Sequence, residues 1–321
     1  MQIKKIILIN LIVLFFLIFV IEFTLRVIFS YNVQGLSENL INKSLNFNFH
    51  NSNLQNGKAF GIRIYTDKNG FRVTKNHQGF KKKKNILFVG GSVTFGAGVK
   101  ANHTYVEKLN KFSKFNVMNA SVFGSNLENN LMILESFKQS NEFEKVFINF
   151  PLDDILSSKV LIDDKEQNIN FTNKIKSNKI INYINRFLRS KSATYVFVKN
   201  LAVNPKINNY LYDLRLYQNE ELIKQLDINL SEISKIYDPK KIFFYAIPYA
   251  AQVMNENCTK KEDPEIIIKK IFNKNNFEIL NLKEKMCANS NTQKFFLKND
   301  PVHLSKSGHE FVFENLKSYV N

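Results

Sequence analysis

Residues 84–96 read Lys-Asn-Ile-Leu-Phe-Val-Gly-Gly-Ser-Val-Thr-Phe-Gly, a short apolar run followed by two glycines and a serine. The run 86–89 has the length and composition of a buried strand, so Ser92 falls where this strand passes into a loop. Helical patterns alternate with this run and four similar ones, which predicts an α/β fold: a three-layer α/β/α sandwich around a parallel sheet of about five strands. The other runs are residues 115–118, 146–150, 242–247 and 277–282.

The helices expected around this sheet follow from the spacing of apolar residues. Residues 105–112 form one helix, and Leu127, Leu131 and Leu134 form an i, i+4, i+7 stripe on the next. Residues 157–240 form a long, mostly helical insertion that packs on the core and is placed to wall a substrate cleft. The expected packing positions of the insertion and of the last helix are Ile180, Ile184, Phe187, Leu222, Leu226, Leu230, Ile233, Val312, Leu316 and Tyr319.

The first thirty residues differ in composition from the rest of the chain. A short basic start precedes a nearly unbroken apolar run at residues 6–21, and extension of the run to Phe29 reaches the ~20 residues that a membrane-spanning helix needs. Glu22 and Arg26 lie four residues apart on one helix face, where they can pair or reach toward an interface. The segment 1–30 is therefore expected to be a membrane anchor.

A cleaved signal peptide is the alternative for this segment, because it too has a basic start and an apolar core. Residues 19–30 are mostly bulky and contain no small-x-small cleavage site, which favours the anchor. The basic start places the N-terminus in the cytoplasm. In a bacterium this predicts a single-pass inner-membrane protein whose domain, residues 61–321, faces the periplasm after a linker at residues 31–60.

The chain is strongly basic, with a net charge of +17 and a pI near 9.6. The only tight cluster, residues 81–84, directly precedes the first core strand, where a solvated loop is expected. No zinc spacing, helix-turn-helix or aromatic RNA signature accompanies it, so nucleic acid is not an expected partner. Scattered lysines in a biased composition are one explanation of the charge. The functional alternative is that the charge serves to bind an anionic polysaccharide or a lipid headgroup surface.

The cysteine content argues against a metal site. Cys258 and Cys287 are too few and too far apart in sequence for one, and no cofactor motif is found. In an extracytoplasmic protein the pair can form a disulfide; the alternative is two buried thiols.

A second short segment, near the other end of the chain, supplies the partners that a nucleophilic serine needs. Residues 300–305 read Asp-Pro-Val-His-Leu-Ser, with a carboxylate and an imidazole three residues apart before a C-terminal helix. A serine needs a base to remove its proton, and the base needs a partner that fixes its tautomer. Ser92, His303 and Asp300 are therefore the candidate catalytic nucleophile, base and orienting carboxylate. The non-catalytic alternatives are that Ser92 is a solvent-facing serine in a glycine-rich turn and that Asp300 is a turn residue before Pro301.

Other motifs do not account for the serine. Thr94 excludes the Gly-x-Ser-x-Gly pattern of α/β-hydrolases, and Gly96 is followed by Ala97 rather than by the Lys of a P-loop. His309 is the competing histidine, but its place inside the final helix favours packing or capping.

The chain resembles the SGNH (GDSL-like) hydrolase superfamily from about residue 60 to the C-terminus. Gly90-Gly91-Ser92 stands where the family usually has Gly-Asp-Ser, as in its membrane-anchored, alginate O-acetyltransferase-like branch. Residues 119–124, Asn-Ala-Ser-Val-Phe-Gly, resemble block two, whose glycine amide, here Gly124, belongs to the oxyanion hole. Asp300 and His303 match the last block. The resemblance implies a flavodoxin-like sheet, and the stretch 69–72, Asn-Gly-Phe-Arg, is similar to one that precedes the serine block in anchored relatives.

Block three departs from the family pattern. The family has Gly-x-Asn-Asp after a strand, whereas residues 150–154 read Phe-Pro-Leu-Asp-Asp, so Asp153 takes the place of the oxyanion-hole asparagine beside the amides of Ser92 and Gly124. An ionised carboxylate repels an oxyanion, and loss of one donor lowers rates on the order of 10²–10³. Three interpretations remain: Asp153 is protonated in a dry site, the amide of Asn126 or Asn149 replaces it, or catalysis is weak.

The resemblance implies a membrane-anchored serine enzyme that acts on acyl esters, above all O-acetyl esters of a cell-surface or exported glycan. It acts as an esterase or as an O-acetyltransferase through an acyl-serine intermediate. Transfer requires an acyl donor from a membrane partner, because the chain carries no membrane acyltransferase module. The alternative is a catalytically impaired SGNH-like protein that binds glycan or scaffolds a polysaccharide export or modification complex. A third option, a basic surface protein that binds anionic polymer by charge alone, leaves the triad unexplained.

Overall fold

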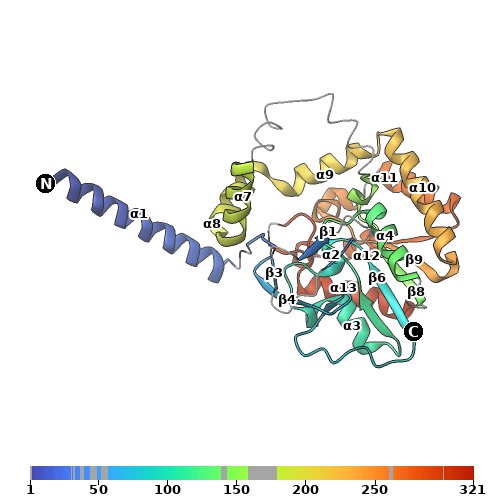
Figure 1. Cartoon of the computed structure of the whole chain (residues 1–321). Helices are drawn as coiled ribbons and strands as arrows, with labels where there is room; N and C mark the ends of the chain where they lie inside the picture. Colours follow the sequence, from blue (N-terminus) through green and yellow to red (C-terminus); the bar gives the residue numbers. More distant parts are fainter. Residues whose placement is uncertain are drawn as a thin grey trace.

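The apolar runs form one parallel five-stranded sheet in the computed structural model of the chain (Figure 1). The structure describes residues 2–29, 31, 33–36, 40–43, 49–51, 57–138, 143–157, 179–259, 263–298 and 300–321. The strands of this sheet are β6 (Asn85–Val89), β7 (Asn116–Asn119), β8 (Phe143–Asn149), β9 (Ile242–Ala246) and β10 (Ile279–Asn281). Every neighbouring pair is parallel, which confirms the predicted strands and the α/β class.

The order of the strands creates a switch point at β6. The sheet runs β10-β9-β8-β6-β7, so the chain leaves β6 for β7 on one side and then returns to β8 on the other. In doubly wound sheets, ligands bind beyond the carboxyl ends of the strands at such a point. Ser92 follows β6 directly, and Asp153 follows β8.

Helices cover both faces of the sheet, because strand side chains alternate between them. Ile86 and Phe88 face one helical layer and Leu87 and Val89 face the other. The first layer contains α3 (Tyr105–Phe112), α12 (Lys283–Cys287) and α13 (Lys306–Leu316); the second contains α4 (Leu127–Lys138), α10 (Glu220–Ile236) and α11 (Asp263–Lys274). The predicted three-layer sandwich is confirmed.

Short 3-10 helices supply many of the turns between these elements. They are η1 (Ala101–His103), η2 (Leu152–Ile155), η3 (Pro239–Lys241), η4 (Ala250–Val253), η5 (Asn255–Cys258), η6 (Thr292–Phe295) and η7 (Lys317–Tyr319).

The expected packing of the insertion is confirmed for one stripe and wrong for the other. The stripe Leu222, Leu226, Leu230 and Ile233 on α10 is fully buried. The stripe Ile180, Ile184 and Phe187 lies on α7 (Lys179–Lys191), where these side chains are 70%, 49% and 52% exposed. The reason is that α7 packs against α8 (Ala193–Val203) beside the N-terminal segment rather than on the sheet. The insertion also contains α9 (Pro205–Leu216).

The N-terminal helix α1 (Gln2–Val27) projects away from the sheet (Figure 1). Its segment Ile3–Val27 has a mean hydropathy of 3.0 and is long and apolar enough to cross a membrane, a test that a signal sequence also passes. Arg26 and Glu22 form the expected ion pair at 2.6 Å.

The expected linker at residues 31–60 carries strands of its own. β1 (Ile41–Lys43) pairs with β2 (Phe49–Asn51), and β3 (Gly57–Ala59) forms an antiparallel sheet with β4 (Ile62–Thr66) and β5 (Arg72–Val73), which lie beyond residue 60. Leu40 and Ala59 are buried against Phe95 and Phe123, close to the loops at the carboxyl end of the main sheet. The described part of this segment is therefore not an unstructured linker, because its apolar residues join a core cluster.

The predicted turn at Asn69-Gly70 is confirmed. The Asp67 carboxylate accepts hydrogen bonds from the amides of Asn69 and Phe71, each at 2.9 Å, and Gly70 has a φ of 77°. The side chain of Asp67 thus closes the turn between β4 and β5, a common use of aspartate.

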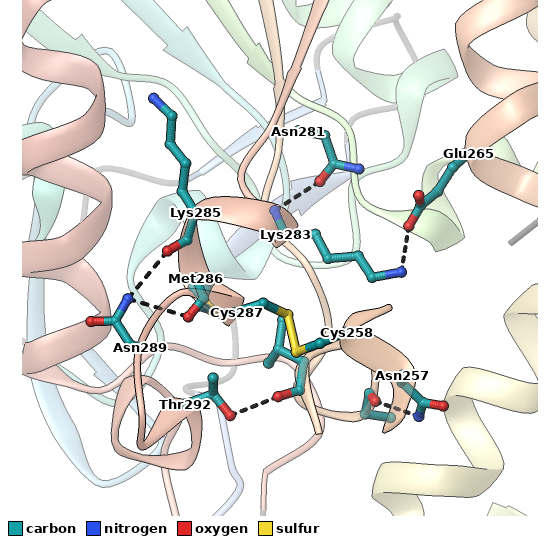
Figure 2. The surroundings of a disulfide bond; sticks show 12 residues. Asn257, Cys258, Glu265, Asn281, Lys283, Lys285, Met286, Cys287, Asn289 and Thr292 are labelled. Atoms are coloured by element: carbon teal, nitrogen blue, oxygen red, sulfur yellow. Dashed lines mark hydrogen bonds and ion pairs between the residues drawn. A yellow bond between two sulfur atoms is a disulfide. The ribbon is translucent and has the colours of Figure 1, made fainter. Parts of the chain in front are cut away.

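Cys258 and Cys287 form a disulfide bond with a Cα–Cα distance of 5.7 Å (Figure 2). It joins η5, which follows β9, to α12, which follows β10. The nearby Thr292 hydroxyl donates to the carbonyl of Val253 at 2.7 Å, so the segment that leads toward residues 300–303 is also attached here. Of the two alternatives for these cysteines, the structure has the disulfide.

Candidate active site

Ser92 is presented at the carboxyl end of β6 by two glycines. It begins the short helix α2 (Ser92–Phe95), and Gly91 occupies the N-cap. Gly90 has a φ of 154°, and a Cβ atom there would lie 2.7 Å from Oγ1 of Thr94 and 3.2 Å from Cβ of Asn149. Only glycine fits this turn without strain, since the backbone conformation and the close approach both exclude a side chain.

The second sequence segment places its imidazole on this serine. His303 Nε2 lies 2.8 Å from Ser92 Oγ, and His303 Nδ1 lies 2.9 and 3.0 Å from the two carboxylate oxygens of Asp300. The carboxylate can only accept a hydrogen bond, so Nδ1 carries the proton and Nε2 is free to accept one from the serine hydroxyl. The structure thus brings the predicted residues Ser92, His303 and Asp300 together in the order that a nucleophile, a base and an orienting group require.

Asp300 is held rigidly beneath the imidazole. It is 3% exposed, and its Oδ1 also accepts from the amides of Val302 and His303 at 2.9 and 2.7 Å. Burial alone raises the pKa of this carboxyl, but His303 and the two amides outweigh it and hold the pKa below its usual value. The amide of Ala250 donates to the carbonyl of Pro301 at 2.8 Å, which ties this loop to the end of β9.

His309 has the packing role that its place in the helix predicts. Its side chain is fully buried in α13, stacks on Tyr105, and accepts a hydrogen bond at Nδ1 from the Tyr105 amide at 3.3 Å. Burial lowers the pKa of His309 to about 3, so it stays neutral. The competitor for the role of base therefore lies in the core and away from the serine.

Two backbone amides belong to residues that line the cavity around Ser92. These are the amides of Ser92, at the start of α2, and of Gly124, which has a φ of 70°. Within the described ranges neither amide donates a hydrogen bond, and both residues line the cavity that also contains His303. The amide of Val122 donates to the carbonyl of Gly90 at 2.9 Å and so fixes the two loops relative to each other. The pair is suited to bind an oxyanion.

Asp153 is the third residue predicted for the oxyanion hole. It belongs to η2 and is not among the residues that line the cavity. The residue is exposed, yet the protein around its carboxyl raises the pKa by desolvation, while a hydrogen bond with the Tyr249 hydroxyl and the charge of His303 lower it. The tyrosine hydroxyl also contacts Asp213 on α9. The carboxylate thus belongs to an acidic cluster, formed by Asp153, Asp154 and Asp213, and it lies within electrostatic range of His303.

Asn126 and Asn149 carry the two amides considered as replacements for Asp153. The Asn126 amide donates to the carbonyl of Leu156 at 2.7 Å. Asn149 is completely buried; its Oδ1 accepts from the amide of Ile247, and its Nδ2 has no partner among the described residues. Neither side chain lines the cavity.

The acidic cluster supports the loop of Gly124. The Asn130 amide donates to Asp154 at 3.3 Å, and Asn130 is also hydrogen-bonded to Ser125, the residue after Gly124. Burial and the charge of Asp153 raise the pKa of Asp154 well above its usual value. This network joins the loop after β7 to the loop after β8.

Asp213 makes stability depend on pH. Burial, and then the charge of Asp153, raise its pKa to about 7, although the Tyr249 hydroxyl lowers it. A carboxyl with a raised folded-state pKa contributes stability that is complete below its unfolded pKa and is lost as the pH rises through about 7. From pH 5 to pH 8 the chain is expected to lose about 2–3 kcal/mol of unfolding free energy through this group. The Asp213→Asn variant has no carboxyl at this position and is expected not to show this loss.

Chemical denaturation at the two pH values measures this difference. Asp227→Asn is the matched control, because Lys274 holds the pKa of that exposed carboxyl below its usual value and outside the window. An unchanged pH slope in Asp213→Asn contradicts the prediction.

Arg72 braces the turn that follows the serine. Its guanidinium is buried and donates to the carbonyls of Phe95, Gly96 and Val99 at 2.8, 2.7 and 2.6 Å, and it lies 4.7 Å from the Phe95 ring centroid. Burial lowers the pKa of Arg72 to about 9, so it remains charged at neutral pH. The arginine of the stretch 69–72 therefore positions the end of α2.

Sequence patterns missed Phe60, which covers the imidazole. Its ring centroid lies 4.6 Å from that of His303, and its backbone has a φ of 51°, which is rare for an aromatic residue. The residue lies at the end of the expected linker, and the adjacent Gly61 was the one signal of a turn there.

The cavity around the serine has a volume of about 650 Å³. It is lined by Gln34, Gly35, Leu36, Phe60, Ser92, Phe123, Gly124, Asn182, Asn185, Arg186, Arg189 and His303. The α7 residues in this set support the expectation that the insertion walls the cleft. A second cavity, of about 560 Å³, lies near the ends of β8, β9 and β10 and contains none of the triad residues. In the described ranges, no group of three or more His, Cys, Asp or Glu residues is placed to hold a metal ion.

Fold and site together define a doubly wound α/β protein with a Ser-His-Asp relay at its topological switch point. No family model matches the chain, and no curated protein matches it. Among solved structures, a lipase/acylhydrolase from Enterococcus faecalis is similar, with a TM-score of 0.42 and 13% identity over 74% of this chain and 97% of that one. A G-D-S-L lipolytic protein from Veillonella parvula has a TM-score of 0.41 and 11% identity over 73% and 97%. A catalytic mutant of an acetylxylan esterase from Geobacillus stearothermophilus has a TM-score of 0.40 and 12% identity over 75% and 95%.

Proposed function

We propose that this chain is a serine-dependent enzyme of SGNH type that cleaves or transfers acyl esters. The observation that carries the proposal is the relay in which Ser92 Oγ, His303 and Asp300 are joined by contacts of 2.8 and 2.9 Å. A hydroxyl in contact with an oriented, unprotonated imidazole nitrogen is the arrangement that activates a serine.

In the proposed reaction the serine oxygen bonds to the acyl carbon while its proton passes to Nε2 of His303. The carbonyl oxygen becomes an oxyanion in front of the amides of Ser92 and Gly124, which have no other acceptor in the described residues. Collapse of the adduct breaks the ester C–O bond, and the leaving alcohol takes the proton from the imidazole. Asp300 stabilises the imidazolium between the two transfers. Water, or a sugar hydroxyl, then attacks the acyl-serine by the same steps.

We further propose that the substrate is an O-acetyl ester of a cell-surface or exported glycan and that α1 anchors the enzyme. Polar side chains of α7, namely Asn182, Asn185 and Arg186, line the cleft and suit a hydroxylated acceptor or leaving group. The disulfide between Cys258 and Cys287 supports an oxidising compartment, such as the periplasmic side of an inner membrane. Under the transferase alternative, a membrane partner supplies the acyl group.

Fluorophosphonate labelling of the full-length chain in detergent tests the serine chemistry. The unaltered chain is expected to be labelled, and Ser92→Ala and His303→Ala are expected to lose labelling, because the first lacks the nucleophile and the second its base. Ser234→Ala is the control, since Ser234 lies on α10 and its hydroxyl donates to a helix carbonyl. Labelling that persists in Ser92→Ala contradicts the proposal. Addition of sugar acceptors to an acylated enzyme then distinguishes transfer from hydrolysis.

A second candidate is a catalytically impaired SGNH-like protein that binds glycan or scaffolds an export or modification complex. The observation that favours it is Asp153, a carboxyl in place of the family's asparagine, which leaves two amide donors facing the serine. An unlabelled but folded chain that retains glycan binding supports this candidate.

A further inference from the structure

Two helices beside the cleft expose large apolar side chains. Tyr183, Ile184 and Phe187 on α7 are 62%, 49% and 52% exposed, and Val198 and Leu201 on α8 are 57% and 70% exposed. We refer to these five residues as the α7–α8 apolar surface. The two helices pack against each other and are joined at Ser192. Large apolar side chains exposed on two helices that pack against each other suit a surface that meets an apolar partner.

The α7–α8 apolar surface is attached to the end of α1. The Glu22 carboxylate accepts hydrogen bonds from the amides of Ala193 and Thr194 at 2.8 Å each, which caps the N-terminus of α8. Arg26 donates to the carbonyl of Lys191 at 2.5 Å. Figure 1 shows α7 and α8 beside the end of α1.

This attachment sets the depth of the two helices. The apolar run 6–21 that precedes Glu22 is about 24 Å long at 1.5 Å per residue, somewhat shorter than the ~30 Å hydrocarbon core of a bilayer, and Lys4 and Lys5 lie just before it. When α1 spans a bilayer, Glu22 and the N-terminus of α8 therefore lie at the bilayer surface.

The charges on these helices suit an anionic surface. The basic residues of the segment 179–203 are Lys179, Arg186, Arg189, Lys191 and Lys199, and the segment has no acidic residue. A helix pair that exposes apolar side chains and carries basic but no acidic residues has the composition that binds at the interface of anionic lipids.

The same helix walls the catalytic cleft. Asn185, Arg186 and Arg189 of α7 line the cavity that contains Ser92 and His303. The backbone amide of Gln34, which follows α1 closely in sequence, donates to the carbonyl of Arg189 at 2.8 Å. The position of α7 at a bilayer surface therefore also sets the position of the cleft.

We propose that the α7–α8 apolar surface docks on the anionic bilayer in which α1 is inserted, and that it holds the catalytic cleft at that surface. The inference rests on the proposed insertion of α1, and its consequence is that the acyl ester is presented by a membrane-held molecule. It depends on residues different from those of the relay.

A single tryptophan tests the docking, because the chain contains none. The full-length Phe187→Trp variant is reconstituted in nanodiscs of phosphatidylcholine and phosphatidylglycerol with brominated acyl chains, which quench tryptophan on contact. Ile266→Trp on α11 is the matched control, since Ile266 is also apolar and 59% exposed. The tryptophan emission of Phe187→Trp is expected to fall by about half relative to unbrominated discs, because an interfacial helix buries its apolar face at the boundary of the acyl chains. The emission of the Ile266→Trp control is expected to remain unquenched. Replacement of phosphatidylglycerol by phosphatidylcholine is expected to reduce the quenching.

The outcomes separate this inference from the proposed function. A chain that elutes with the discs but shows equal, weak quenching in both variants overturns the docking alone. Emission that is blue-shifted without quenching by bromine shows that protein covers this surface, and it also overturns the docking. A chain that does not elute with the discs overturns both the anchor and the docking. Fluorophosphonate labelling of the same samples reports separately on Ser92.

Discussion

Asp300→Asn is expected to reduce turnover about 10⁴-fold, because the variant inverts the hydrogen bonding of His303. Asp300 accepts from Nδ1 of His303 and leaves Nε2 without a proton, 2.8 Å from the hydroxyl of Ser92. An asparagine amide turned toward the ring donates to Nδ1 and moves the ring proton to Nε2. That nitrogen can then no longer accept the serine proton.

Hydrolysis of p-nitrophenyl acetate and the rate of fluorophosphonate labelling measure this effect, and the denaturation midpoint shows whether the fold is retained. Asp238→Asn is the matched control: Asp238 also accepts a backbone hydrogen bond, from Lys240 at 3.0 Å, but it precedes β9 at the amino end of the sheet. Turnover within tenfold of the unaltered chain would show that Asp300 does not orient the base.

Arg72→Met is expected to lower the unfolding free energy by about 3 kcal/mol or more, because it leaves buried carbonyls without donors. The guanidinium makes hydrogen bonds to Phe95, Gly96 and Val99, and methionine can replace only its packing. These carbonyls belong to the end of α2 and the loop after it, so the position of Ser92 is expected to loosen as well. Labelling by fluorophosphonate should therefore slow even at temperatures where the variant remains folded.

Thermal or urea denaturation measures the loss of stability. Arg63→Met on the neighbouring strand β4 is the control, since Arg63 is exposed. Equal stability of the two variants would mean that the three carbonyls find other donors. Arg72→Lys should recover only part of the loss, because one ammonium cannot reach three carbonyls with the geometry of a guanidinium.

Local sequence patterns were sufficient to predict the sheet. The central strands β6, β7 and β8 contain runs of side chains that are buried on both faces, so their pattern needs no knowledge of the neighbouring strands. The same holds for the stripe on α10. The stripe on α7 has the same apolar spacing, but spacing does not tell whether a helix packs on the sheet. The prediction for Ile180, Ile184 and Phe187 was wrong for that reason.

The triad was predictable because its chemistry has a sequence signature. Ser92 follows a strand with two glycines, and Asp300 and His303 lie three residues apart, so each half of the relay is local. The contact between the halves joins residues 211 positions apart in sequence and follows from the strand order.

The sequence by itself determined the α/β class, the five strands, the relay residues and the apolar N-terminal helix, because each is written in a short pattern of polarity or residue type. Only the tertiary structure decided the positions of Phe60 over His303, of Arg72 on the carbonyls after Ser92, and of Asp153 beside Tyr249. Those positions depend on contacts between distant segments, and such contacts have no local pattern. The exposure of the α7–α8 apolar surface was decided in the same way, since burial is a property of the whole packed chain.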